Sequence, residues 1–171
     1  MALHLIVDGY NLMGLRPRIS ENWEAERRRL TQRLTRYAQT KGHPVTVVFD
    51  GWRSDNMSEG EERLGPLTVI YSRSGEKADQ VIIRLAGRYG RAGVVVSSDR
   101  EVSTAALAAG CVALRAVEFE RRLAALPAPD AGRSGRADDQ VPLRPATRVK
   151  LGNPKRLSKT DRQKRKRLAV L

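Results

Sequence analysis

Four aspartates adjoin apolar segments in the first hundred residues of this chain. They lie in LIVDGYN, VVFDGW, KADQ and VVVSSD, as Asp8, Asp50, Asp79 and Asp99. Carboxylates that are brought together repel one another and raise one another's pKa, so a fold gathers several of them mainly around a cation. Ligand sets made of oxygen alone, without Cys or His, favour Mg²⁺ or Mn²⁺. The pattern therefore predicts a site for a hard divalent cation.

Such a cation suggests phosphodiester chemistry. Mg²⁺ keeps several of its waters, binds a few carboxylates together with a substrate phosphate, and can activate a water for in-line attack. We predict that all four aspartates are catalytic and that Asp8, Asp79 and Asp99 hold the metal. Asp50 would coordinate through water or orient the nucleophile. The alternative for each residue is a strand-end or helix-capping acid that accepts backbone N–H groups.

Five further polar side chains are predicted to bind the substrate around these acids. Asn11 in DGYN could hydrogen-bond a carboxylate or a phosphate, or shape the turn. Ser98, like Ser97 before it, could contact a metal-bound water or cap the following helix. Arg53, Arg73 and Lys77 fall on expected loops near the acids and could hold phosphates, with solvated surface as the alternative.

Aromatic residues near the acids offer a second way to contact nucleic acid. Trp52 and Tyr10 could stack on bases, and packing is the favoured interpretation for Tyr10. The run Arg27–Arg29 is interpreted as the solvated face of a helix.

The acids are positioned by alternating strands and helices. We expect helices over 22–40, 77–89, 101–109 and 117–126, a polar loop over 51–65, and strands over 3–7, 45–49, 67–71, 93–96 and 111–114. This alternation predicts an α/β fold with a parallel sheet of about five strands between two helical layers. All strands then end at one edge, where ligands bind in such sheets. A strand order of 3-2-1-4-5 would make the strands before Asp8 and Asp99 neighbours.

The charge is distributed unevenly along the chain. Of 171 residues, 32 are Lys or Arg and 19 are Asp or Glu, a net charge of +13. Residues 127–171 hold 13 Lys and Arg against 4 Asp and Glu, a net of +9, in a segment rich in Pro and Gly. We expect a folded domain over 1–126 and a flexible basic tail over 127–171 that contacts polyanions such as RNA.

Cysteine content and hydropathy indicate the compartment. The one cysteine, Cys111, lies in an apolar run and has no disulfide partner within the chain, as expected of a buried thiol in a reducing compartment. The segment Met1–Val7 lacks the basic region and apolar length of a signal peptide, and no apolar run is long enough to span a membrane. We therefore expect a cytoplasmic protein.

The motifs, taken in order over residues 1–126, resemble the YacP-like NYN domain family, a bacterial branch of the PIN-like nucleases. They are LIVDGYNLMG, VTVVFDGW, KADQVIIRLAGRYG, VVVSSDREV and AAGCVALRAVEFERRL. The resemblance implies a three-layer α/β/α fold, a divalent metal and endoribonuclease activity, with mRNA on the ribosome as a further implied target. It carries Asp8, Asp50, Asp79 and Asp99 over as the acidic cluster and Asn11 and Ser98 as flanking positions. The family commonly has a second acid where this chain has Gln80, which leaves one carboxylate fewer.

Three functions are weighed. The first is an endoribonuclease in which metal-activated water attacks phosphorus and leaves a 5′-phosphate. The second is a non-catalytic RNA- or ribosome-binding protein with a degenerate nuclease site. The third, a phosphatase of the haloacid dehalogenase type, needs two acids two residues apart after the first strand. Tyr10 occupies the second position, which argues against that class.

Overall fold

A computed structural model of the chain describes residues 3–14, 22–51, 60–126, 165–167 and 169. The chain divides into two units, residues 1–126 and residues 127–170, and each is considered by itself. In the second unit, residues 165–167 are helical and Ala169 lies in a turn. Most of the basic segment 127–171 thus lies outside the described residues.

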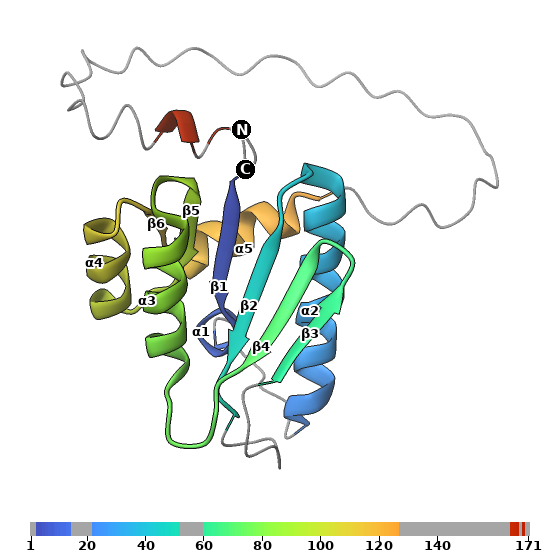
Figure 1. The fold of residues 1–171 in the computed structure, drawn as a ribbon. Coiled ribbons are helices and arrows are strands. Elements are labelled where there is room, and N and C mark those ends of the chain that lie inside the picture. The colour runs from blue at the N-terminus through green and yellow to red at the C-terminus, as the bar shows by residue number, and fades with distance from the viewer. Residues whose placement is uncertain (1–2, 15–21, 52–59, 127–164, 168, 170–171) are drawn as a thin grey trace, which may run out of the picture. The chain divides into compact units, whose positions relative to one another are not determined.

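The first unit is built on a sheet in the order β3-β4-β2-β1-β5-β6 (Figure 1). Its strands are β1 (His4–Asp8), β2 (Val45–Phe49), β3 (Gly60–Leu64), β4 (Leu67–Tyr71), β5 (Gly93–Val96) and β6 (Val112–Leu114). The strands other than β3 run parallel, and they follow the 3-2-1-4-5 order considered from the sequence. β1 therefore has β2 and β5 as its neighbours.

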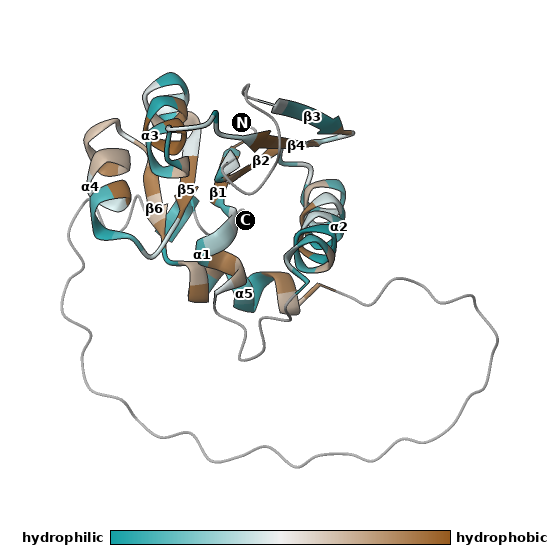
Figure 2. Ribbon diagram, turned by 90° about the horizontal axis from the view of Figure 1, so that it is seen from below, coloured by the Kyte–Doolittle hydropathy of each residue, from teal (hydrophilic) through white to brown (hydrophobic). Residues whose placement is uncertain are grey.

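Helices cover both faces of this sheet. They are α1 (Gly9–Met13), α2 (Trp23–Lys41), α3 (Ala78–Tyr89), α4 (Arg100–Ala108) and α5 (Ala116–Ala124), with a 3₁₀ turn, η2 (Gly90–Ala92). Seen along the strands, α3 and α4 lie on one face, and α1, α2 and α5 lie on the other (Figure 2). The predicted three-layer α/β/α arrangement is confirmed. Among the described residues, no helix has both the length and the apolarity needed to cross a membrane.

The core follows the alternation of side chains along the strands. Ile6, Val48 and Ile70 point to the α3 face and are buried against Val81 and Ile82 of that helix. On the other face the rings of Tyr37 in α2 and Phe119 in α5 meet edge to face, with their centroids 5.1 Å apart. The aliphatic side chains of the strands are thus buried on both faces of the sheet, as a parallel sheet requires.

The prediction of a loop over 51–65 was wrong for its second half, where β3 pairs antiparallel with β4. β3 is polar and exposed, with the sequence GEERL. An edge strand that pairs on one side only has little need for apolar residues, so its pattern carries no strand signal. The hairpin turns at Gly65, whose φ of 62° suits the two-residue connections found between antiparallel strands. Residues 52–59 lie outside the described part.

α1 was also missed, because its five residues are too few to show a helical period. The sequence treated DGYN as a turn. In the structure Asp8 is the N-cap of this helix, and Gly14 ends it. The four longer helices begin and end within two residues of the predicted bounds.

Candidate active site

Asp8 is the most enclosed of the four aspartates, with 7% of its surface exposed. It ends β1 and caps α1, and its Oδ1 accepts the backbone N–H of Asn11 at 3.0 Å. Its Oδ2 accepts the hydroxyl of Ser97, which follows β5, at 3.2 Å. The turn after Asp8 is tight, because a Cβ on Gly9 would clash with the ring of Phe49. The carboxylate is therefore held from two strands and fixed in direction.

Asp50 positions the second acidic segment. Its Oδ1 accepts the backbone N–H of Ala78 at 2.6 Å, at the start of α3. This bond ties the end of β2 to the first turn of α3, where Asp79 lies. The next residue, Gly51, packs so closely that an added Cβ would clash with the carbonyl oxygen of Ser72. Asp50 thus fixes the helix that carries Asp79.

Asp99 caps α4. Its Oδ1 accepts the N–H groups of Glu101 at 2.7 Å and Val102 at 3.1 Å. Its own N–H donates to the Ser97 Oγ at 3.1 Å. Ser97 thereby links Asp8 to Asp99, across the neighbouring ends of β1 and β5.

Asn11 and Ser98 lie together beside this link. The Asn11 Oδ1 accepts the backbone N–H of Ser98 at 2.9 Å, which joins α1 to the turn before α4. The Ser98 Oγ accepts the N–H of Ala116 at 3.3 Å, at the start of α5. Both predicted substrate-binding residues therefore brace the loops of the edge. Their contact with a substrate stays a prediction.

The carboxylates are close enough to affect one another's protonation. Burial raises the pKa of Asp8 from its ordinary 3.8 to about 6, and the charges of Asp79 and Asp50 add to the rise. The bonds from Asn11 and Ser97 oppose it. The pKa of Asp79 is also raised, first by partial burial and then by Asp99 and Asp50. Negative charge thus accumulates at one edge of the sheet, where a proton or a cation would relieve it.

The predicted cationic residues fall at different places. Lys77 is the N-cap residue of α3, and its charge lowers the pKa of Asp79. Arg73 is largely exposed and forms an ion pair with Glu76, Nε to Oε2, at 3.7 Å. Arg53 lies outside the described residues, as does Trp52. The edge therefore has one described cation that acts directly on an acid of the cluster.

Tyr10 packs against other aromatic rings, which is the role favoured for it from the sequence. Its ring meets Trp23 and Phe49 edge to face, with centroids 5.7 and 5.5 Å apart.

A metal ion would find oxygen ligands here, and few of them. Within the described ranges, no three or more His, Cys, Asp or Glu side chains gather so that they could hold a metal ion. Three of the four aspartates also accept backbone N–H groups. In Asp50 and Asp99 these bonds use Oδ1 and leave Oδ2 without a partner among the described residues. Such a set suits a cation that is held by one or two carboxylates and otherwise by water.

Two serines support the acids through bonds that the sequence did not predict. Ser72 is fully buried; its hydroxyl accepts the N–H of Gly51 at 3.0 Å and donates to the carbonyl oxygen of Glu76 at 2.7 Å. It thereby joins the ends of β2 and β4. A serine after a strand is common in loops, so its burial gave no signal in the sequence. Ser97 was weighed together with Ser98, but its bonds to two acids depend on the strand order.

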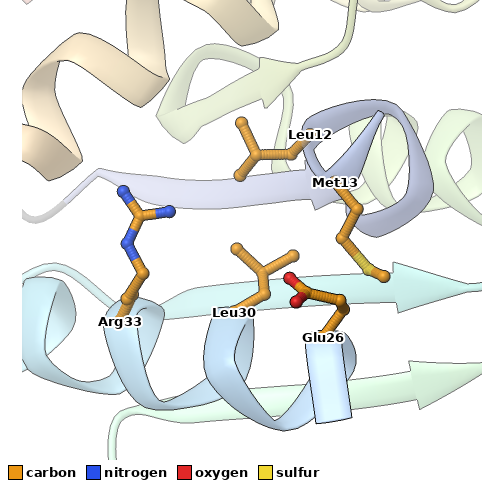
Figure 3. A pocket seen from close by; sticks show the side chains of 5 residues that line it. All are labelled: Leu12, Met13, Glu26, Leu30 and Arg33. Carbon is orange, nitrogen blue, oxygen red and sulfur yellow. The ribbon is translucent and has the colours of Figure 1, made fainter. Parts of the chain in front are cut away.

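A small pocket whose lining contains no aspartate lies between α1 and α2 (Figure 3). Its lining consists of Leu12, Met13, Glu26, Leu30 and Arg33. Arg33 is bound in bidentate fashion to Glu120 of α5, at 3.1 and 2.8 Å. Glu26 pairs with Arg29 at 3.5 Å. Arg33 therefore joins α2 to α5, and Glu26 is paired within α2, so the polar groups of this pocket already have partners.

Comparison with known proteins extends these observations. A sequence profile of the YacP-like NYN domain family matches residues 5–166, which includes most of the basic C-terminal segment. The chain is 33% identical over 86 residues to the "Uncharacterized protein YacP" of Bacillus subtilis (strain 168), a match that covers 48% of this chain and half of that protein. Two crystal structures of Rae1 (YacP) from Bacillus subtilis are similar. One has 26% identity and a TM-score of 0.60 over 72% of this chain and 74% of that one. The other, of a point mutant of that protein, has 28% identity and a TM-score of 0.58, over 71% and 74%.

Proposed function

Because this chain belongs to the family of YacP-like NYN domains, we propose that it is a metal-dependent endoribonuclease of the cytoplasm that hydrolyses RNA phosphodiester bonds. The observation that carries the proposal is that four aspartates from four separate segments lie near enough for their charges to act on one another: Asp79 and Asp50 act on Asp8, and Asp99 and Asp50 act on Asp79. Their mutual effect on pKa supports it, since charge repulsion of this kind is tolerated chiefly at functional sites.

The divalent cation, Mg²⁺ or Mn²⁺, would be served by Asp8, Asp79 and Asp99, with one or two of these carboxylates bound to it directly and the rest acting through its waters. Such an ion lowers the pKa of water and neutralises charge that develops on a phosphate. Gln80 stands next to Asp79, so a fifth carboxylate is lacking at that position. The remaining residues position the acids. Asn11 and Ser97 orient Asp8, and Asp50 fixes the helix that presents Asp79.

The basic segment 127–171 is proposed to contact the RNA backbone, or the ribosome when the RNA is an mRNA. Its net charge of +9 would offset the repulsion between a polyanion and the acidic edge.

The proposal is tested by cleavage of a 5′-labelled RNA with Mn²⁺, with and without ribosomes. Asp8→Asn keeps the shape of the side chain and removes the charge that would hold the cation. We expect at least a ~100-fold loss of cleavage, as is typical when one electrostatic group of an active site is removed. Glu62→Gln, on the exposed strand β3 at the far end of the strand order from β1, is the matched control and should cleave like the wild type. Equal cleavage rates for Asp8→Asn and the wild type would rule out the proposed nuclease activity.

A second function is favoured by one observation, namely that three of the acids already bond backbone N–H groups. The chain would then be a non-catalytic RNA- or ribosome-binding protein with a degenerate site. In that case no preparation cleaves RNA, with or without ribosomes, yet RNA binding persists.

The two functions share a prediction for the basic segment. Deleting residues 127–171 should weaken RNA binding and flatten its dependence on salt, because fewer counterions are released when fewer phosphates are contacted. Affinity measured at several salt concentrations, for the full and the shortened chain, gives the slopes. An unchanged slope would show that the segment does not contact the polyanion.

A further inference from the structure

Arg27 of α2 differs from the arginines beside it. Arg28 pairs with Glu24 at 3.5 Å, and Arg29 pairs with Glu26 at 3.5 Å, and the side chains of both arginines are largely exposed, at 68% and 69%. Arg27 is half-buried. The expectation that Arg27–Arg29 is a solvated face is therefore correct for two residues and wrong for the first.

The guanidinium of Arg27 lies against an aromatic ring. Its Cζ is 5.7 Å from the centroid of the Tyr71 ring, within the range of a cation–π contact. Among the described residues, no carboxylate pairs with this guanidinium. The ring also stacks on Phe49, with centroids 5.8 Å apart and planes inclined by 25°. Within the described part of the chain, Arg27 is thus held by an aromatic surface rather than by an acid.

The position of this contact relates it to the acidic cluster. Tyr71 is the last residue of β4 and lies opposite Phe49, the residue before Asp50, in the parallel register. The ring is therefore at the carboxyl edge, one strand away from Asp50. It faces α2, whereas Asp50 bonds to α3 on the other face. An RNA strand that crosses this edge of the sheet would pass from the aspartates to Arg27.

The chemistry of the pair suits a phosphate. An acidic edge repels RNA, so cations next to it must hold the backbone. A guanidinium in contact with a ring rather than with a carboxylate keeps its N–H donors available, and these can bind a phosphate in bidentate fashion. The contact with the ring also reduces the side-chain entropy that binding would otherwise cost. Of the predicted phosphate-binding cations, Arg73 is already paired with Glu76.

We propose that Arg27, held against the ring of Tyr71, binds a backbone phosphate of single-stranded RNA that lies next to the scissile one. The inference rests on the proposed function, because it takes the acidic edge to be the place where RNA is cut. It adds a direction to that function: the substrate strand crosses the carboxyl ends of β2 and β4 from the α3 face to the α2 face.

Binding without cleavage tests the inference. Fluorescence anisotropy with a labelled single-stranded RNA is measured in EDTA for the full chain and for Arg27→Ala, Tyr71→Leu and Arg28→Ala. Arg27→Ala should weaken binding about tenfold or more, the usual loss for a charged hydrogen-bonded pair. Its salt slope should fall by about 0.7, as for one phosphate contact on a single strand. Arg28→Ala removes the same charge from the same helix and should change affinity less than about twofold.

The outcomes are distinguishable from those of the cleavage assay. If Arg27→Ala and Arg28→Ala have the same affinity and salt slope, the inference is overturned, whatever the cleavage result. If Asp8→Asn cleaves like wild type while Arg27→Ala binds weakly, the nuclease fails and the phosphate contact stands. Thermal unfolding checks that each variant is folded. Should Arg27→Ala not fold, Arg27→Lys keeps the charge but loses the bidentate geometry, and wild-type affinity for it would overturn the proposal.

Discussion

Each end of β1 carries an ionisable side chain whose pKa is shifted by burial, but the shift favours the form present at neutral pH at one end and disfavours it at the other. At the amino end, burial and the charge of Arg88 lower the pKa of His4 to about 4. Its ring stacks on Tyr89, with centroids 3.9 Å apart, and its Nε2 lies 2.8 Å from the Thr46 Oγ1. At the carboxyl end, burial raises the pKa of Asp8 to about 6.

The difference lies in which form is present at pH 7. His4 is neutral there, which is the form that its partly buried surroundings favour. Asp8 is ionised in a buried place near two other carboxylates, which is the form that its surroundings disfavour. One end of the strand is therefore optimised for the fold, whereas the other retains an electrostatic cost. A cost of this kind is expected where a cation or substrate is to be bound, because binding removes it.

The largest effect is expected for Asp8→Asn on stability. A carboxyl whose pKa is raised in the folded state stabilises the fold below its unfolded pKa, near 4, and loses this contribution as the pH rises through 6. A shift of about two units corresponds to about 3 kcal/mol. Relative to wild type, the unfolding free energy of Asp8→Asn should thus increase by up to about 3 kcal/mol between pH 4 and pH 7.5. Urea unfolding in EDTA at both pH values measures it.

Mn²⁺ provides the control for this measurement. At ten times its dissociation constant, the ion should stabilise the wild type by about 1.4 kcal/mol and narrow its difference from Asp8→Asn. A difference between the two proteins that does not change from pH 4 to pH 7.5 would mean that Asp8 carries no electrostatic cost, and the contrast between the two ends of β1 would disappear.

The sequence predicted the elements better than it predicted their connections. Apolar runs such as Val45–Phe49 predict a buried strand, and the alternation of strands with helices predicts a parallel sheet. The acids could therefore be assigned to one edge from the sequence. β3 could not be predicted, because the polar residues of an edge strand are stabilised by pairing with β4 rather than by burial.

Less of the candidate site than of the fold could be predicted from the sequence. Backbone N–H groups donate to the carboxylates of Asp8, Asp50 and Asp99. These bonds depend on loop geometry within a few ångströms, which composition and spacing do not determine. The contact between Arg27 and Tyr71 joins residues 44 positions apart, and it depends on the register in which β4 pairs with β2. Sequence could therefore predict which edge is acidic, but not which bonds hold each acid or which cation faces it.

The smaller effect concerns the amino end and sharpens the contrast. A histidine whose pKa is lowered in the folded state stabilises the fold above its unfolded pKa of 6.5, and this contribution is lost as the pH falls through 4. Since the ring is partly exposed, we expect about 1–2 kcal/mol. His4→Gln should lack this loss, so its unfolding free energy should fall less than that of wild type between pH 7 and pH 4.

Between pH 4 and 6.5 the two ends oppose each other, because acidification relieves Asp8 while it penalises His4. Relative to wild type, Asp8→Asn should therefore lose more stability on acidification, and His4→Gln should lose less. Urea unfolding at several pH values, with all three proteins in EDTA, separates the two slopes. If both variants shifted the slope in the same direction, the two ends of β1 would not be opposites, and the assignment of the electrostatic cost to the carboxyl edge would be wrong.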